Sequence, residues 1–141
     1  MAAAPEAFLF AAFPCEIPVK DYIQAMPEMM LFFNNTKCAP HVLTANWSFA
    51  HIVFSDTPSL YKEELAGETT NRISIIAACN KSSKLDALNA LVKTTSDGFE
   101  RAVEILNGSP EACETFKKFA TGLIRFHISV ARYRLAELEL Q

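Results

Sequence analysis

The residues of this chain best suited to chemistry lie in the stretch Asn46–Glu68. Placed on a helix, its apolar residues and one histidine recur at steps of three or four and share one face, which consists of Trp47, His51, Phe54, Pro58, Tyr61 and Leu65. A histidine within such an apolar stripe either lines a site or is a buried imidazole whose hydrogen bonds are satisfied. His51 is therefore the first candidate site residue.

A second histidine, His127, falls on the apolar stripe of the last predicted helix. Two imidazoles on different helices can hold a divalent ion, each giving one ring nitrogen to the metal and the other to an acceptor. A catalytic zinc or nickel site needs three protein ligands and leaves a position open for water or substrate. The position one turn after His127 is Ala131, so a third ligand must come from elsewhere. The candidates are His41, Asp56 and Cys79.

The same helices predict a pocket beside the two histidines that would take a small-molecule ligand. Its predicted lining consists of Trp47, Phe54, Asp56, Tyr61 and Arg132. The alternative is that His51 and His127 are core imidazoles, hydrogen-bonded to each other, to Tyr22 or Tyr133, or to the backbone. The sequence leaves both interpretations open.

Four amphipathic segments predict the elements that would position these residues. They cover Val19–Asn34, Asn46–Gly67, Ser82–Gly108 and Pro110–Leu140, and they indicate an all-α, up-and-down four-helix bundle. Three prolines make residues 1–18 a short amino-terminal arm, packed on the body or on a second copy, which leaves residues 19–141 as the bundle domain. Pro27 predicts a break near Ala25–Met26. The apolar run Ile73–Cys79 is expected to be a brief helical turn or an extended linker.

The periodicity also predicts which side chains face the core. In the first segment they are Tyr22, Ile23, Met26, Met29, Met30 and Phe33. In the third they are Leu85, Leu88, Leu91, Val92, Phe99, Val103 and Leu106. In the last they are Phe116, Phe119, Leu123, Phe126, His127, Val130, Arg134 or Leu135, and Leu138. The three methionines in five residues at Met26–Met30 are expected to fill gaps in the core rather than to form a ligand-binding wall.

Composition excludes several classes of protein. Half of the 141 residues are hydrophobic, only 21% are charged, and the net charge is −3. Because the basic residues are scattered and the balance is acidic, a nucleic-acid partner is not expected. The apolar run Ala7–Phe13 is too short to span a bilayer and lacks a basic flank, so we expect neither a signal peptide nor a membrane partner, and a cytoplasmic location. Four scattered cysteines predict reduced thiols.

Three segments resemble the DinB-like superfamily, also called the YfiT-like metal-dependent hydrolases. In NWSFAHIVFSDTPSLYKEELAGE, Trp47, His51, Ile52, Ser55 and Asp56 match a Trp-x-x-x-His-Ile pattern followed by a small polar residue and an acid. SKLDALNALVKTTSDGFERAVEILNGSP is similar to the family's next helix. LIRFHISVARYRLAEL resembles its closing His-x-x-x-His-Arg segment, with His127 as the first histidine, Ala131 in place of the second and Arg132 as the arginine.

This resemblance implies a four-helix bundle, frequently dimeric, with a three-histidine divalent-metal site. With one histidine missing, it predicts an incomplete metal site in a degenerate thiol-dependent transferase or hydrolase. If active, the metal would lower the pKa of water or a small thiol. The rival hypothesis is a non-enzymatic binding or adaptor protein that forms a homodimer through apolar helix faces. A third is a carrier of a hydrophobic ligand.

Overall fold

The computed structural model describes residues 5–36 and 72–129, and every regular element in these two ranges is helical. The absence of strands from this part of the chain confirms the predicted all-α class. The up-and-down four-helix arrangement is not confirmed by these helices and stays a prediction. The predicted second helix, Asn46–Gly67, lies outside the described residues.

Prolines shape the amino-terminal half of the described structure. Helix α1 (Pro5–Ala12) is followed by two 3₁₀ turns, η1 (Val19–Asp21) and η2 (Ile23–Ala25), and then by helix α2 (Met26–Thr36). Pro27 is the second residue of α2, where its missing N–H costs nothing, so the break predicted at this point is confirmed. The prediction that Ile23 faces the core is wrong. Its side chain is 43% exposed, because the 3₁₀ turn interrupts the α-helical period.

Helix α5 (Arg72–Asn80) corrects the expectation for the run Ile73–Cys79, which is neither a single turn nor an extended linker. Ile73 and Ala77 are one turn apart and both are buried against helix α6, and this packing favours a full helix. Lys81, the first residue after the helix, has a left-handed φ of 52°. The N–H groups of Lys81 and Ser82 donate to the carbonyls of Ala78 and Ala77, at 3.3 and 3.0 Å. This is the Schellman pattern that satisfies carbonyls at a helix end.

Helices α6 (Lys84–Leu106) and α7 (Pro110–Ser129) begin where the sequence predicts. Between them, the N–H of Ser109 donates to the carbonyl of Leu106 at 2.8 Å, and the carbonyl of Ser109 accepts from the N–H of Cys113 at 3.0 Å. Most of the predicted stripes are buried. Leu85 and Phe126 are not, with exposed fractions of 49% and 61%, and each lies near an end of its helix.

A capping box fixes the start of α6. The Oγ of Ser83 accepts from the N–H of Asp86 at 3.0 Å, and the carboxylate of Asp86 accepts from the N–H of Ser83 at 3.3 Å. We therefore expect Ser83→Ala to lower the free energy of unfolding by about 1 kcal/mol, since it removes a cap from the longest described helix. Urea denaturation followed by circular dichroism measures this. Ser82→Ala is the control, and an equal loss in the two variants would contradict the capping role.

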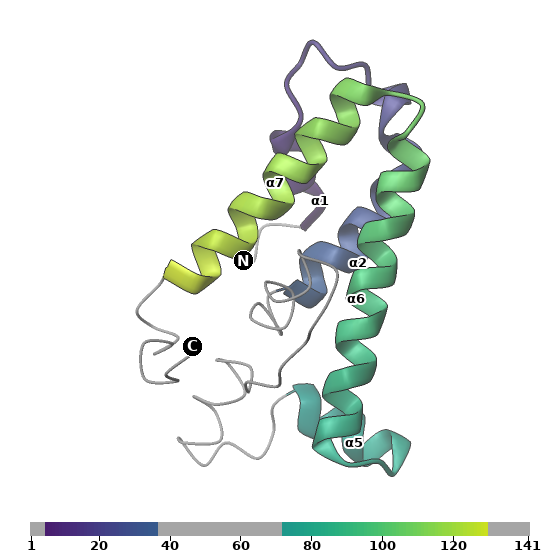
Figure 1. Cartoon of the computed structure of the whole chain (residues 1–141), viewed down its shortest axis with the longest axis vertical. Helices are drawn as coiled ribbons and strands as arrows, with labels where there is room; N and C mark the ends of the chain where they lie inside the picture. The colour runs from purple at the N-terminus through teal and green to yellow at the C-terminus, as the bar shows by residue number, and fades with distance from the viewer. Residues whose placement is uncertain (1–4, 37–71, 130–141) are drawn as a thin grey trace.

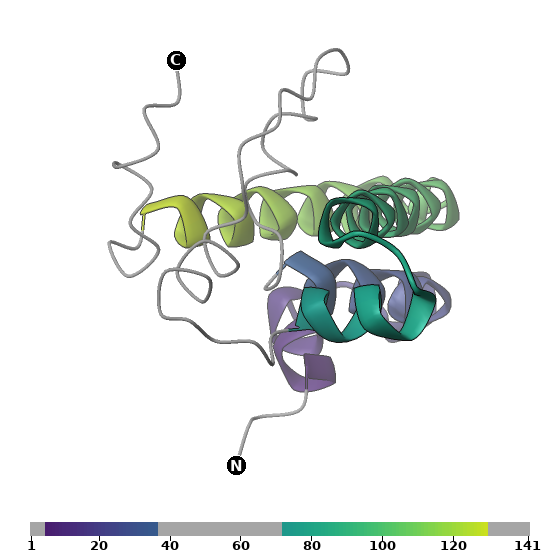
Figure 2. The ribbon, with the colours of Figure 1, turned by 90° about the horizontal axis from the view of Figure 1, so that it is seen from below.

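The helices form two layers, with α6 and α7 in one and α1, α2 and α5 in the other (Figure 2). Helix α6 runs along most of the described structure and contacts α2, α5 and α7 (Figure 1). Its first half packs on α5, whereas its second half shares the main core with α1, α2 and α7. Gly98 lies where α2 crosses, and a Cβ there would come within 3.1 Å of Leu31 Cδ2. A small residue at this crossing permits the close approach of the two helices.

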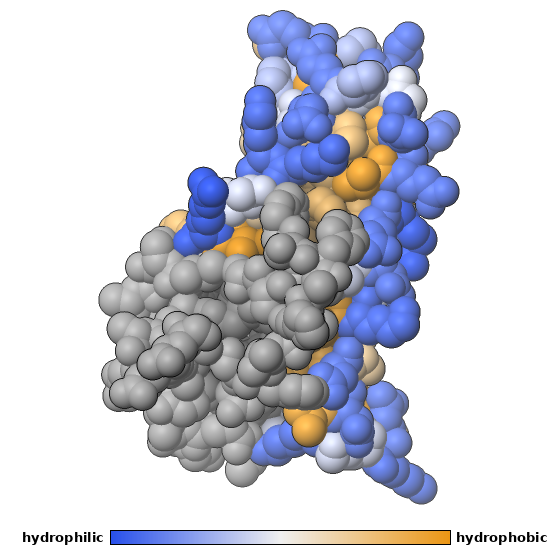
Figure 3. Space-filling model, viewed as in Figure 1, coloured by the Kyte–Doolittle hydropathy of each residue, from blue (hydrophilic) through white to orange (hydrophobic). Residues whose placement is uncertain are grey.

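Hydrophobic side chains gather between α6 and α7 and hydrophilic ones cover the outer faces (Figure 3). No helix within residues 5–36 and 72–129 is both long and apolar enough to cross a membrane.

Candidate functional site

Most residues of the predicted site lie outside the described parts of the chain. These are His41, Trp47, His51, Phe54, Asp56, Tyr61 and Arg132. His127 belongs to α7, but the position of its side chain is not described. The proposed grouping of His51 with His127 therefore stays a prediction. Within residues 5–36 and 72–129, no three His, Cys, Asp or Glu side chains are grouped so that they could hold a metal ion.

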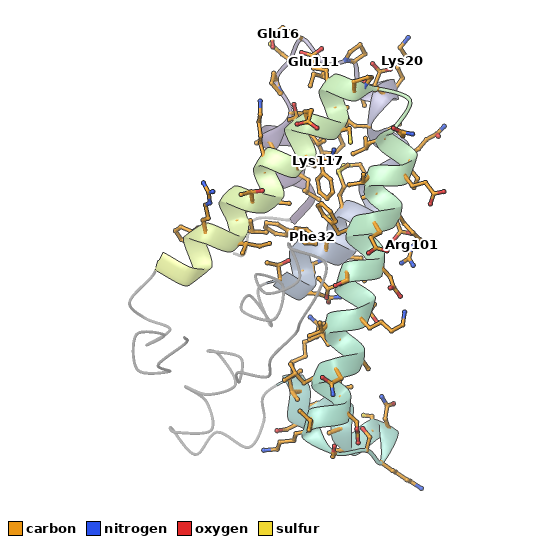
Figure 4. The ribbon with its side chains drawn as sticks, in the orientation of Figure 1. Glu16, Lys20, Phe32, Arg101, Glu111 and Lys117 are labelled. Atoms are coloured by element: carbon orange, nitrogen blue, oxygen red, sulfur yellow. The ribbon has the colours of Figure 1, made fainter. Side chains whose placement is uncertain are left out.

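The described helices supply a rigid aromatic framework. Phe32 of α2, Phe99 of α6 and Phe116 of α7 form a three-ring cluster, with centroid separations of 5.4 Å (Phe32–Phe99), 5.9 Å (Phe32–Phe116) and 5.5 Å (Phe99–Phe116). Phe32 and Phe116 are almost completely buried, and Phe32 is seen between α7 and α6 in the view of Figure 4. These tilted, edge-on and stacked geometries are the favourable ones for aromatic pairs. We call these three residues the aromatic core.

A second set of rings joins α2 to the amino-terminal helix. Phe33 stacks on Phe8 of α1 and on Phe119 of α7, at 6.0 Å in both cases. Phe13 stacks on Tyr22 at 4.0 Å, so the arm packs on the body of the same chain. The consecutive residues Phe32 and Phe33 of α2 thus pack in different directions, Phe32 in the aromatic core and Phe33 against Phe8 and Phe119. Met26 and Met29 are buried in the same core, which confirms the gap-filling role expected of them.

A polar pair at the end of α2 was missed by the sequence analysis. The Nη2 of Arg72, the first described residue of α5, donates to the Oδ1 of Asn35 at 2.9 Å. Asn35 is only 2% exposed, and its neighbour Thr36 is buried with its hydroxyl donating to the carbonyl of Phe32 at 2.7 Å. A buried amide oxygen needs a donor, and Arg72 supplies one from 37 positions further along the chain. Helical periodicity carries no signal for such a long-range pair.

Other charged contacts lie on the surface and support the framework. The Nη2 of Arg101 donates to the Oε2 of Glu28 at 3.0 Å, joining α6 to α2 on the outer side (Figure 4). The hydrogen bond that Arg101 donates to Glu28 raises the pKa of Arg101 above its ordinary value. On α7, the hydrogen bond that Lys117 donates to Glu114 likewise raises the pKa of Lys117. Exposed pairs of this kind contribute little to stability and do not form a site.

The sequence profile of the trichodiene synthase (TRI5) family matches residues 29–141 of this chain. The chain belongs to this family. Among curated relatives, the alpha-cuprenene synthase COP6 of Coprinopsis cinerea is 36% identical over 127 residues, covering 90% of this chain and 34% of that protein. Monoterpene synthase 25 of Postia placenta is 37% identical over 120 residues, covering 85% of this chain and 30% of that protein. Terpene synthase BipA of Cochliobolus sativus is 30% identical over 135 residues, covering 93% of this chain and 36% of that protein.

This trichodiene synthase family member therefore spans about a third of the length of the curated relatives it matches. No solved structure matches the chain. The match begins within α2, covers α5, α6 and α7, and includes the whole of the segment Asn46–Gly67 that holds most of the predicted site.

Family membership corrects the resemblance to DinB-like hydrolases, which is wrong. The predicted function as a degenerate thiol-dependent transferase or hydrolase is therefore also wrong. The alternative of a non-enzymatic adaptor is wrong as well, because these matching relatives are named as synthases. The physical reason is that a tryptophan four residues before a histidine on an apolar helix face is a packing pattern that unrelated helical proteins share. The predicted divalent metal is compatible with the family, but zinc and nickel are not supported.

Proposed function

We propose that this chain acts in terpene synthesis, and that its substrate is an isoprenoid diphosphate. The observation that carries the proposal is the family match over residues 29–141, together with relatives that are named as terpene synthases. Building a terpene skeleton from an isoprenoid chain requires a good leaving group on the hydrocarbon. A diphosphate is such a group, and Mg²⁺ binds phosphate oxygens well.

Mg²⁺ changes which predicted site residues matter. Terpene synthases typically use this ion, which prefers carboxylate oxygens and seldom takes imidazole. On the helix that the sequence predicts for Asn46–Gly67, Asp56, Ser59 and Glu63 fall at steps of three and four and would share a face. We propose these oxygen donors, rather than His51 and His127, as the residues that would hold the ion. The ion would supply neutralisation of the diphosphate charge.

The aromatic residues of the predicted pocket suit the other half of the substrate. Loss of diphosphate leaves a cationic hydrocarbon, and aromatic faces attract cations. Trp47, Phe54 and Tyr61 would offer such faces and would exclude water from the reacting carbon. The described helices contribute rigidity, because the aromatic core ties α2, α6 and α7 together on either side of this segment in the sequence.

The test is product formation by the purified chain incubated with C10 and with C15 isoprenyl diphosphates and Mg²⁺. We expect a terpene product, detected by gas chromatography and mass spectrometry of a solvent extract, that disappears when EDTA is added. A calorimetric titration with inorganic pyrophosphate and Mg²⁺ measures binding without turnover. Absence of both product and pyrophosphate binding would overturn the proposed function.

A further inference from the structure

Helix α5 packs outside the main hydrophobic core. The buried side chains of the described residues form two separate groups, a large one shared by α1, α2, α6 and α7 and a small one between α5 and α6. Among the described elements, α6 is the one on which α5 packs extensively, at the end of α6 that lies away from α7 (Figure 1). We call the second group the small cluster, and its buried members are Ile73, Ala77, Ala87, Leu88, Leu91 and Val92.

The packing of α5 in the small cluster is slight. Of its nine residues, Ile73 and Ala77 are the two that are buried, and Ile75 is 53% exposed. Because an alanine removes little apolar surface from water, the hydrophobic contribution to this docking is small. Isolated helices shorter than about 12 residues are not stable in water. If α5 leaves α6, it should therefore lose its helix as well, at a much lower cost in free energy than unfolding of the main core.

The two ends of α5 are held in different ways. At the carboxyl end the chain turns directly into α6 through residues 81–83, with Lys81 in a left-handed conformation. At the amino end, the Nη2 of Arg72 donates to the Oδ1 of Asn35 at 2.9 Å and so joins α5 to α2. Asn35 is buried and the guanidinium is charged, which makes this one of the stronger kinds of hydrogen bond.

We propose that α5 is a flap, which opens from α6 as one unit about residues 81–83 while the main core stays folded. In this proposal the hydrogen bond between Asn35 and Arg72 is the latch that keeps the flap closed. Opening would expose Leu88, Leu91 and Val92, the apolar side chains of α6 that α5 covers in the closed state. The inference does not depend on the proposed function, since it rests on the packing of described helices alone.

Hydrogen exchange of the intact chain, followed residue by residue by NMR, tests the flap without any substitution. We expect the amides from Ile76 to Asn80 to have protection factors at least about tenfold lower than those from Phe116 to Ala120 in α7, and to share one free energy of opening. Simple fraying would instead give protection that falls steadily toward the ends of α5. Such a gradient, or equal protection in α5 and α7, would overturn the flap.

Arg72→Met tests the latch, because it keeps an unbranched side chain but removes its donors. We expect it to lower the protection of α5 by about tenfold, as loss of a hydrogen bond to a charged group would, and to leave α7 within about twofold of wild type. Arg101→Met is the matched control. It also removes a donor to an α2 side chain, at 3.0 Å from Glu28, but from an exposed position on α6, and it should leave α5 unchanged.

The two halves of the proposal fail in different ways. If Arg72→Met leaves the protection of α5 unchanged, or if Arg101→Met lowers it equally, the hydrogen bond to Asn35 is not the latch. If Arg72→Met lowers the protection of α5 and α7 alike, α5 opens only when the whole domain unfolds, and the flap itself is overturned.

Discussion

Phe32→Ala is expected to lower the free energy of unfolding by about 3 to 5 kcal/mol, a large part of the stability of a domain of this size. Phe32 is 1% exposed and contacts Phe99 and Phe116, so its removal leaves a cavity where α2, α6 and α7 meet. The surrounding rings cannot collapse into this space, because each is held by a second ring. Urea denaturation followed by circular dichroism measures the change.

Phe126→Ala provides the matched control for this prediction. It deletes the same side chain from α7, but at a position where 61% of the residue is exposed. The expected loss is within about 0.5 kcal/mol, as for most surface substitutions. Equal losses in the two variants would show that the aromatic core does not join the three helices.

Two phenylalanines of α7, Phe116 and Phe126, indicate how far sequence reasoning reaches. Periodicity placed both on the inner face, since it reports only that a residue lies on the apolar stripe of its own helix, and it did not place Phe32 on the face of its segment. Whether a neighbouring helix covers that stripe is a tertiary property. Phe116 stacks against Phe99 of α6, contacts Phe32 of α2 and is buried, whereas Phe126 and Leu85 lie near helix ends and are exposed.

The residues that begin helices were predicted more reliably, because they act on backbone groups that are close to them in the sequence. Ser83 before α6 and Pro110 at the start of α7 act through backbone groups a few residues away, and both helix starts are confirmed. Asn35 and Arg72 are the opposite case. Their hydrogen bond forms only because α2 and α5, which are far apart in the sequence, lie close together in the fold. The sequence around either residue does not predict this contact.

The predicted site shows a further limit of this reasoning. Histidines attracted attention because they are rare and lay on apolar stripes, and two of them suggested a zinc or nickel centre. Family membership instead favours oxygen donors in the same stretch, such as Asp56, which the sequence had placed in the predicted pocket. Composition and spacing can therefore indicate which segment carries candidate ligands without indicating which metal ion those ligands bind.

Asp56→Asn is expected to reduce Mg²⁺-dependent terpene formation by at least about 100-fold, which corresponds to roughly 2.7 kcal/mol of lost transition-state stabilisation. The substitution keeps the size of the side chain and one oxygen, but it removes the negative charge that Mg²⁺ prefers. Since the proposed role of the ion is to neutralise the diphosphate, pyrophosphate affinity measured by calorimetry should fall together with turnover. Circular dichroism should show an unchanged helix content.

His51→Gln is the control that separates the two candidate metal sites. It removes the imidazole from the same predicted helix while keeping a polar side chain of similar length. If Asp56 holds the ion, His51→Gln should change pyrophosphate affinity less than about threefold, because Mg²⁺ gains little from a nitrogen ligand. If instead His51→Gln abolishes metal-dependent binding and Asp56→Asn does not, the proposed carboxylate site is wrong and His51 holds the ion. A Mg²⁺ enzyme and a histidine-bound metal centre thus predict opposite results for two substitutions five residues apart.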